Sequence, residues 1–139
     1  MAPAGISHLD LVVSSIDRSL PFYRELLEPL GYTRLREIVG ERGEMITYLS
    51  IPGRFEGSLG LREAQSAGPG ALHDRYRVGV HHVCFNAPSR AIVDDRWAWL
   101  RERGATVESE PREYGHTPGY YAVFFHDPDG IKLELVHRP

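Results

Sequence analysis

The sequence predicts an α+β fold built from two βαβββ modules, each a small mixed sheet with one helix packed on its outer face. The first supporting observation is a near repeat, in which residues 5–13 align with residues 79–87 at an offset of 74. The second is that the same offset aligns residues 59–61 with residues 133–135. The third is that each half carries one helical pattern among several short strand patterns. Together they indicate a duplicated module.

The first module begins with a strand, because side chains over residues 6–13 alternate between two faces. Asp17 is the expected N-cap of a helix over residues 18–28. The apolar stripe of this helix is Leu20, Tyr23, Leu26 and Leu27. Turn residues such as Pro52-Gly53 then separate three more predicted strands, at residues 32–37, 45–51 and 58–63.

The second module copies this order. A strand over residues 78–86 leads to Ser89, the expected N-cap of a helix over residues 90–103 that ends at Gly104. The side chains expected to face the core are Ile92, Val93, Trp97 and Leu100. Further strands are predicted at residues 106–109, 120–126 and 132–136.

Length and spacing predict one domain over residues 1–139, because a chain of this size can bury a core without disulfides. Within it we expect the first module at residues 5–63, a linker at residues 64–77 that contains a Gly/Pro-rich stretch, and the second module at residues 78–137.

Composition excludes several classes of partner. The net charge is −3 and no basic run is present, which argues against a nucleic-acid surface. A single cysteine, Cys84, excludes an internal disulfide and is compatible with a reducing compartment. No stretch has the length of a membrane span or the pattern of a signal peptide. We therefore expect a cytoplasmic protein without nucleic-acid or membrane partners.

Strand alternation turns three side chains that can bind a metal toward the concave side of the predicted sheets. If Leu9 and Leu11 pack on the helix, His8 points to the opposite, concave face, and the same argument turns His82 and Glu134 inward. Two imidazoles and a carboxylate suit a divalent metal such as Fe(II), Mn(II), Ni(II) or Zn(II), with open positions for substrate, water or dioxygen. The repeat therefore predicts two half-sites that meet around one metal ion.

Each of these residues also has an ordinary interpretation. A lone histidine on a strand is more often a packed or surface residue than a metal ligand, and Glu134 could lie on a solvated face. The identical register of His8 and His82 in two copies, together with the carboxylate, favours the metal site.

Three segments carry a family resemblance: residues 7–13, Phe22-Tyr23 and residues 126–134. Over residues 5–137 the chain resembles the vicinal oxygen chelate superfamily, which includes glyoxalase I, bleomycin-resistance proteins, extradiol dioxygenases, fosfomycin-resistance enzymes and methylmalonyl-CoA epimerase. The resemblance implies a curved mixed sheet around a metal cavity, in which an oxygen-rich substrate chelates the ion and the metal stabilises developing negative charge or activates an oxidant.

Gly60 separates the chain from some of these relatives. Resemblance to glyoxalase I implies a fourth ligand on the last strand of the first module, and the repeat places Gly60 at that position, as the equivalent of Glu134 in the second module. This departure argues against lactoylglutathione lyase and epimerase activity. We expect Gly60 to leave space beside the metal.

The three-ligand relatives are the extradiol dioxygenases and the fosfomycin-modifying transferases. Resemblance to the dioxygenases implies a role for His116, for the turn at residues 127–130 and for Glu134, all of which match. Phe124 stands where those enzymes have a tyrosine, and it cannot hydrogen-bond a catecholate. The resemblance to the fosfomycin enzymes is thinner, because no cluster for a phosphonate or a potassium ion is evident.

His116 has two interpretations that the sequence leaves open. It is either a general acid or base in a loop at the cavity mouth, or an ordinary exposed histidine. The other expected site residues, which contact substrate unless they serve as ordinary strand packing, are Tyr48, Gly60, Tyr120, Tyr121 and Phe124.

The sequence thus predicts a metal-dependent enzyme with a three-ligand site that acts on a small oxygenated substrate. The narrower form of this prediction is an aromatic substrate. The expected reaction is dioxygenase-like rather than glyoxalase I-like. The alternative is a binding protein of the bleomycin-resistance type, which sequesters a drug or metabolite without catalysis. A homodimer is expected, and the modules of one site can come from one chain or from two.

Overall fold

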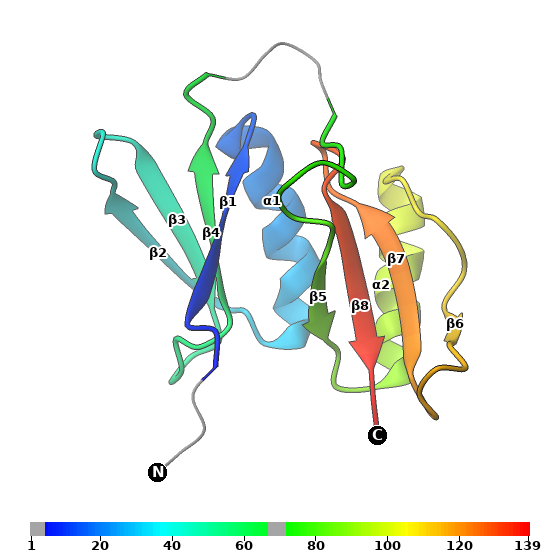
Figure 1. Ribbon diagram of the computed structural model, residues 1–139. Helices are drawn as coiled ribbons and strands as arrows, with labels where there is room; N and C mark the ends of the chain where they lie inside the picture. Colours follow the sequence, from blue (N-terminus) through cyan, green and yellow to red (C-terminus); the bar gives the residue numbers. More distant parts are fainter. Residues whose placement is uncertain (1–4, 67–71) are drawn as a thin grey trace. The chain divides into compact units, whose positions relative to one another are not determined.

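The computed structural model describes residues 5–66 and 72–139, and it has the α+β architecture that the sequence predicts (Figure 1). The contacts divide the chain into two compact units, Met1–Pro69 and Gly70–Pro139. Each unit holds one four-stranded mixed sheet and one α-helix, as expected of a βαβββ module. A single domain over the whole chain stays a prediction, and residues 67–71 of the predicted linker lie outside the described residues.

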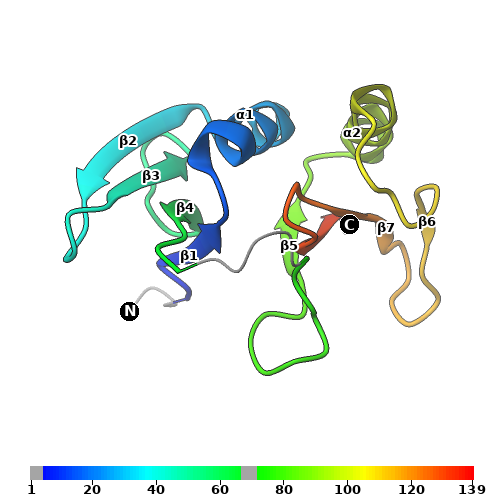
Figure 2. The ribbon, with the colours of Figure 1, turned by 90° about the horizontal axis from the view of Figure 1, so that it is seen from above.

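The first unit consists of β1 (His8–Val13), α1 (Ile16–Leu27), the 3₁₀ turn η1 (Glu28–Leu30), β2 (Arg34–Val39), β3 (Met45–Ser50) and β4 (Ser58–Glu63). Its strands lie in the order β1-β4-β3-β2, with β1 parallel to β4 and the other pairs antiparallel. α1 covers one face of the sheet (Figure 2). The core between helix and sheet is formed by Leu11, Val13, Phe22, Tyr23, Leu26, Leu27, Leu59 and Leu61.

The start of α1 differs from the prediction. The N-cap is Ser15, whose Oγ accepts the backbone N–H of Arg18, and Asp17 lies inside the first turn. Both residue types favour this end of a helix. Serine supplies a compact hydroxyl at the cap, while a carboxylate one turn in interacts with the positive end of the helix dipole.

The second unit consists of β5 (Val83–Asn86), α2 (Arg90–Arg103), β6 (Arg112–Glu113), β7 (Tyr121–His126) and β8 (Lys132–His137). The strands lie in the order β5-β8-β7-β6, with β5 parallel to β8, and α2 covers one face (Figure 2). The core of this unit includes Phe85, Val93, Leu100, Val123, Phe125, Leu133 and Leu135.

The ends of α2 confirm the prediction, but part of its buried face does not. Ser89 Oγ accepts the N–H of Ile92 at 3.2 Å, and Gly104 ends the helix with φ of 76°. Arg96, where the sequence predicted Trp97, is buried on the helix face of Val93 and Leu100, and its planar guanidinium stacks on the ring of Trp99 at 5.0 Å. Over residues 5–66 and 72–139, neither α-helix has the length and apolar character needed to cross a bilayer.

Two predicted strands of the second unit are wrong in extent. β5 begins at Val83 rather than at residue 78, because Gly79 has φ of 141° and bends the chain away from an extended path. Residues 106–109 form only an isolated bridge between Val107 and Phe125, and the edge strand lies further on, at β6. Edge pairing of this kind is decided by tertiary contacts rather than by local pattern.

Candidate metal centre

Glu134 lies in the middle of the sheet face opposite α2. Its neighbours Leu133 and Leu135 on β8 are fully buried, which turns the glutamate side chain to the other face. The strand register pairs Glu134 with Cys84 of β5 on one side and with Phe124 of β7 on the other. The local sequence therefore places one carboxylate at the centre of this face, as predicted.

His82 meets Glu134 directly. The distance between His82 Nε2 and Glu134 Oε2 is 3.1 Å, and the Glu134 side chain is only 3% exposed. Tyr120 Oη donates a hydrogen bond to the other carboxylate oxygen, Oε1. A buried carboxylate is stable only when its oxygens have partners, so these two contacts explain how Glu134 is accommodated.

The separation of the two donor atoms is compatible with a metal as well as with a hydrogen bond. Two ligand atoms, each about 2.0–2.2 Å from one ion, lie about 2.8–3.6 Å apart at angles between the right angle and the tetrahedral angle. His82 and Glu134 supply a nitrogen and an oxygen, which suits a first-row divalent cation. Within either unit, over the residues described, no group of three or more His, Cys, Asp or Glu side chains is arranged to bind an ion.

The neighbouring ionisable groups stay in their neutral forms. Desolvation, followed by the negative charge of Glu134, raises the pKa of the Cys84 thiol to about 12, so the metal-free chain holds a thiol rather than a thiolate. Desolvation and the hydrogen bond to Glu134 also raise the pKa of Tyr120. Tyr120 therefore remains a hydrogen-bond donor at neutral pH.

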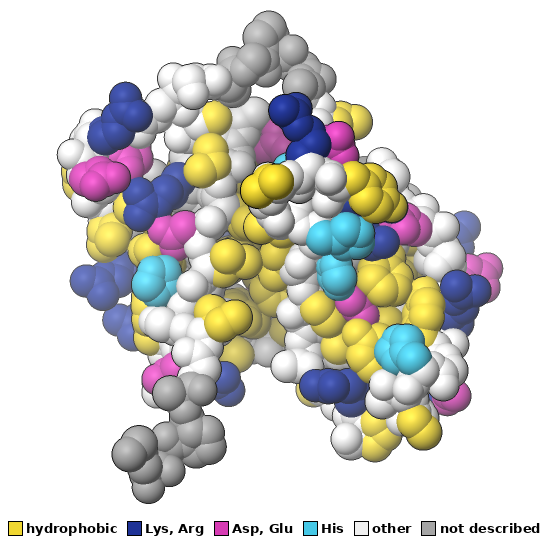
Figure 3. Space-filling view, in the orientation of Figure 1, with side chains coloured by type: hydrophobic (Ala, Val, Ile, Leu, Met, Phe, Trp, Pro, Cys, Tyr) yellow, Lys and Arg dark blue, Asp and Glu magenta, His cyan; other side chains and the backbone are white. Residues whose placement is uncertain are grey.

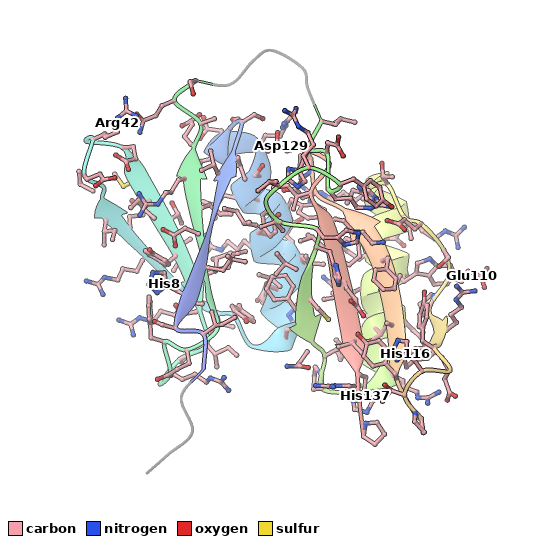
Figure 4. The ribbon with its side chains drawn as sticks, in the orientation of Figure 1. His8, Arg42, Glu110, His116, Asp129 and His137 are labelled. Carbon is pink, nitrogen blue, oxygen red and sulfur yellow. The ribbon has the colours of Figure 1, made fainter. Side chains whose placement is uncertain are left out.

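Aromatic rings extend from the His82–Glu134 pair along the same face. Phe124 lies edge-on to His82 with ring centroids 6.1 Å apart, and Tyr114 lies 5.6 Å from Phe124. His116 lies 4.9 Å from the ring of Tyr120, near the start of β7 (Figure 4). Figure 3 shows histidines gathered over β5 and β8 with hydrophobic side chains around them. The structure thus brings His116, Tyr120 and Phe124 together with the predicted ligands of the second unit.

Tyr121 lies elsewhere, contrary to its predicted place in the site. Its hydroxyl donates to Asp94 Oδ1 of α2 at 2.6 Å, and the guanidinium of Arg90 stacks over its ring at 4.8 Å. Of the two adjacent tyrosines, it is Tyr120, just before β7, whose hydroxyl reaches Glu134.

His81 is a neighbour that the sequence interpretation missed. Because β5 starts only at Val83, strand alternation assigns no face to His81. His81 Nδ1 lies 2.8 Å from His82 Nδ1, so it orients the imidazole of His82. Desolvation and the nearby charge of His82 lower the pKa of His81.

His8 lies at the start of β1 in the first unit (Figure 4). Its ring packs against Tyr48 and Phe55, with centroid distances of 5.6 and 5.4 Å, and its Nδ1 lies 3.0 Å from Ser7 Oγ. His8 belongs to one unit and the His82–Glu134 pair to the other, so the meeting of all three stays a prediction.

Gly60 does not leave free space beside it, and that expectation is wrong. The register places Asp10 and Tyr48 on either side of Gly60, and their side chains close over it. A Cβ at this position would lie 2.6 Å from Tyr48 Cε1 and 2.9 Å from Asp10 Cγ. Tyr48 Oη and Arg62 Nε both donate to Asp10 Oδ2, at 3.0 and 2.7 Å, which holds the carboxylate there.

Comparison with known proteins gives consistent results. The family model described as the Glyoxalase/Bleomycin resistance protein/Dioxygenase superfamily matches residues 5–135. The uncharacterized protein YqjT of Bacillus subtilis (strain 168) is 32% identical over 130 residues, which is 93% of this chain and 95% of YqjT. Metallothiol transferase FosB of Staphylococcus epidermidis is 29% identical over 132 residues, 94% of this chain and 81% of FosB.

Solved structures show the same fold. The glyoxylase/bleomycin resistance protein/dioxygenase domain from Frankia sp. EAN1pec matches with a TM-score of 0.78 and 28% identity, covering 99% of this chain and 100% of that one. A putative glyoxalase from Bacillus halodurans matches with a TM-score of 0.72 and 26% identity, covering 96% and 95%.

Proposed function

We propose that this chain, which belongs to the Glyoxalase/Bleomycin resistance protein/Dioxygenase superfamily, is a metal-dependent enzyme in which His82 and Glu134 hold a divalent cation. The observation that carries the proposal is the 3.1 Å distance between His82 Nε2 and Glu134 Oε2, at a carboxylate that is almost completely buried. His8 is proposed as the third ligand on the strength of the sequence repeat alone.

The donor set defines the chemistry of such a site. A divalent ion held by imidazole and carboxylate groups would supply Lewis-acid polarisation of a substrate oxygen. Phe124 and Tyr114 would offer an apolar wall to the carbon skeleton of the substrate. His116, an exposed imidazole beside Tyr120, is proposed to exchange a proton with a substrate oxygen. We therefore propose a small oxygenated substrate.

Two reaction types fit these residues. A dioxygenase-like reaction is supported by His116, the turn at residues 127–130 and Glu134, and it is opposed by Phe124 at the expected tyrosine position. Transfer of a thiol to the substrate is supported by the similarity to FosB, whose name is metallothiol transferase, over 94% of this chain. Oxygen uptake with a panel of catechols tests the first reaction. Loss of free thiol with small oxygenated electrophiles tests the second.

A metal titration of the purified chain tests the proposal itself. We expect saturable binding of Mn(II) or Zn(II) by the wild type, and a large loss of affinity in His82→Ala and Glu134→Gln. His137→Ala is the matched control, because His137 lies on the α2 side of β8 and its Nδ1 contacts the carbonyl oxygen of Ala87. Equal binding by all four proteins would contradict the site.

The second candidate function is sequestration of a drug or metabolite without catalysis. Phe124 favours it, because this residue replaces a hydrogen-bonding group of catalytic relatives with an apolar ring. A metal-free chain that binds an aromatic metabolite tightly would support sequestration and exclude the enzyme. The expected homodimer is a further part of the proposal, and the mass of the protein in solution tests it.

A further inference from the structure

We infer that Tyr120 is a positioning residue whose hydroxyl holds one oxygen of Glu134, so that only the other oxygen is presented beside His82 for metal binding. This inference rests on the proposed function. It changes the role that the sequence suggested for Tyr120, from contact with substrate to control of a ligand.

The two oxygens of Glu134 have different partners. Oε1 accepts the hydrogen bond from Tyr120 Oη, whereas Oε2 lies 3.1 Å from His82 Nε2. A carboxylate with both oxygens available can bind an ion through one or through both. Because Oε1 is held by a donor and Oε2 is the oxygen beside His82 Nε2, a cation next to this imidazole meets Oε2 first. The arrangement therefore favours binding through a single oxygen.

The backbone and the ring of Tyr120 are themselves held in place by the preceding turn. Tyr120 N donates to the carbonyl oxygen of Thr117 at 3.1 Å, and Tyr114 N donates to the carbonyl oxygen of Tyr120 at 2.9 Å. The Tyr120 ring packs edge-on against both His116 and Tyr114, with centroid distances of 4.9 and 6.3 Å. A side chain fixed by both backbone and ring contacts can orient a partner, as ligand-orienting groups near metals do.

Removing the hydroxyl leaves Glu134 without an equivalent donor at Oε1. Cys84 is the register neighbour on β5, and a thiol is only a weak donor. The carboxylate is then free to turn away from the orientation that faces His82. Loss of a group that orients a metal ligand typically lowers metal affinity about 10- to 100-fold.

Tyr120→Phe tests the inference, and Tyr121→Phe is its matched control. Both substitutions remove one phenolic hydroxyl that donates to a carboxylate, but the partner of Tyr121 is Asp94 on the other face. We expect Tyr120→Phe to weaken Zn(II) binding by about 10- to 100-fold. We expect Tyr121→Phe to leave the affinity within about twofold, as for a change remote from the ligands. The absorption spectrum of the Co(II)-loaded chain should change only in Tyr120→Phe.

The outcomes separate this inference from the proposed function. If the wild type binds metal and Tyr120→Phe binds it equally well with the same Co(II) spectrum, the inference is wrong and the proposed function stands. If the wild type binds no metal, the inference on Tyr120 and the proposed metal-dependent function are both wrong.

A second measurement does not depend on whether the variant folds. Infrared difference spectra of the wild-type chain with and without Zn(II), with isotope-labelled glutamate, report how the carboxylate binds. We expect a mode in which one oxygen binds the metal, and a mode in which both oxygens bind would overturn the inference.

Discussion

Replacing Gly60 with alanine tests the closed packing found in the first unit. The new Cβ would lie 2.6 Å from Tyr48 Cε1 and 2.9 Å from Asp10 Cγ, closer than real Cβ atoms approach other atoms. Asp10 cannot simply move aside, because Tyr48 and Arg62 both bind its Oδ2 and its Oδ1 is buried. Forced overpacking typically destabilises a protein by about 1–3 kcal/mol.

A partial compensation comes from the unfolded chain. Alanine in a strand is favoured over glycine by about 0.5–1 kcal/mol, because glycine loses more conformational freedom on folding. The offset leaves a net loss for Gly60→Ala of about 0–2.5 kcal/mol in the free energy of unfolding, centred near 1 kcal/mol.

Urea denaturation followed by far-ultraviolet circular dichroism measures this loss. Gly115→Ala is the matched control, because a Cβ there has no atom within 4 Å and the glycine lacks a positive φ. Removing the Asp10 side chain should cost less stability in the Gly60→Ala background than in the wild type, since the clash is then relieved. A Gly60→Ala protein that unfolds at the wild-type urea concentration or above would refute the reasoning.

Two further outcomes are expected from local features of the second unit. Ser89→Ala removes the hydroxyl that caps α2 and should lower the free energy of unfolding by about 1 kcal/mol in the same urea assay, whereas an unchanged midpoint would contradict the capping role. Desolvation and the charge of Glu134 raise the pKa of Cys84 to about 12, so its thiolate population at pH 8 lies far below that of free cysteine. The rate at which Cys84 of the metal-free chain reacts with Ellman's reagent should therefore keep rising up to pH 10. A plateau of this rate near pH 9 would contradict the raised pKa.

Features set by neighbouring residues in the chain could be predicted from the sequence. Ser89 and Gly104 fix the ends of α2 through contacts within one turn, so the predicted helix agrees with the observed Arg90–Arg103. Alternation along β8 likewise placed Glu134 opposite the buried Leu133 and Leu135.

The features that were missed depend on what each residue meets across the sheet. The sequence showed that Gly60 lacks a side chain, but only the register of β1, β4 and β3 brings Asp10 and Tyr48 over it. The contact of His81 with His82 was likewise beyond alternation, because the strand begins two residues after His81, at Val83. The hydrogen bond from Tyr120 to Glu134 joins the loop before β7 to β8, and no spacing rule indicates it.

An anomalous-scattering map from crystals of the metal-loaded chain tests the central claim most directly. We expect one peak within about 2.0–2.2 Å of both His82 Nε2 and Glu134 Oε2. Tyr120 should still donate to Oε1. A peak remote from the His82–Glu134 pair, or no peak in crystals grown with saturating metal, would contradict the account.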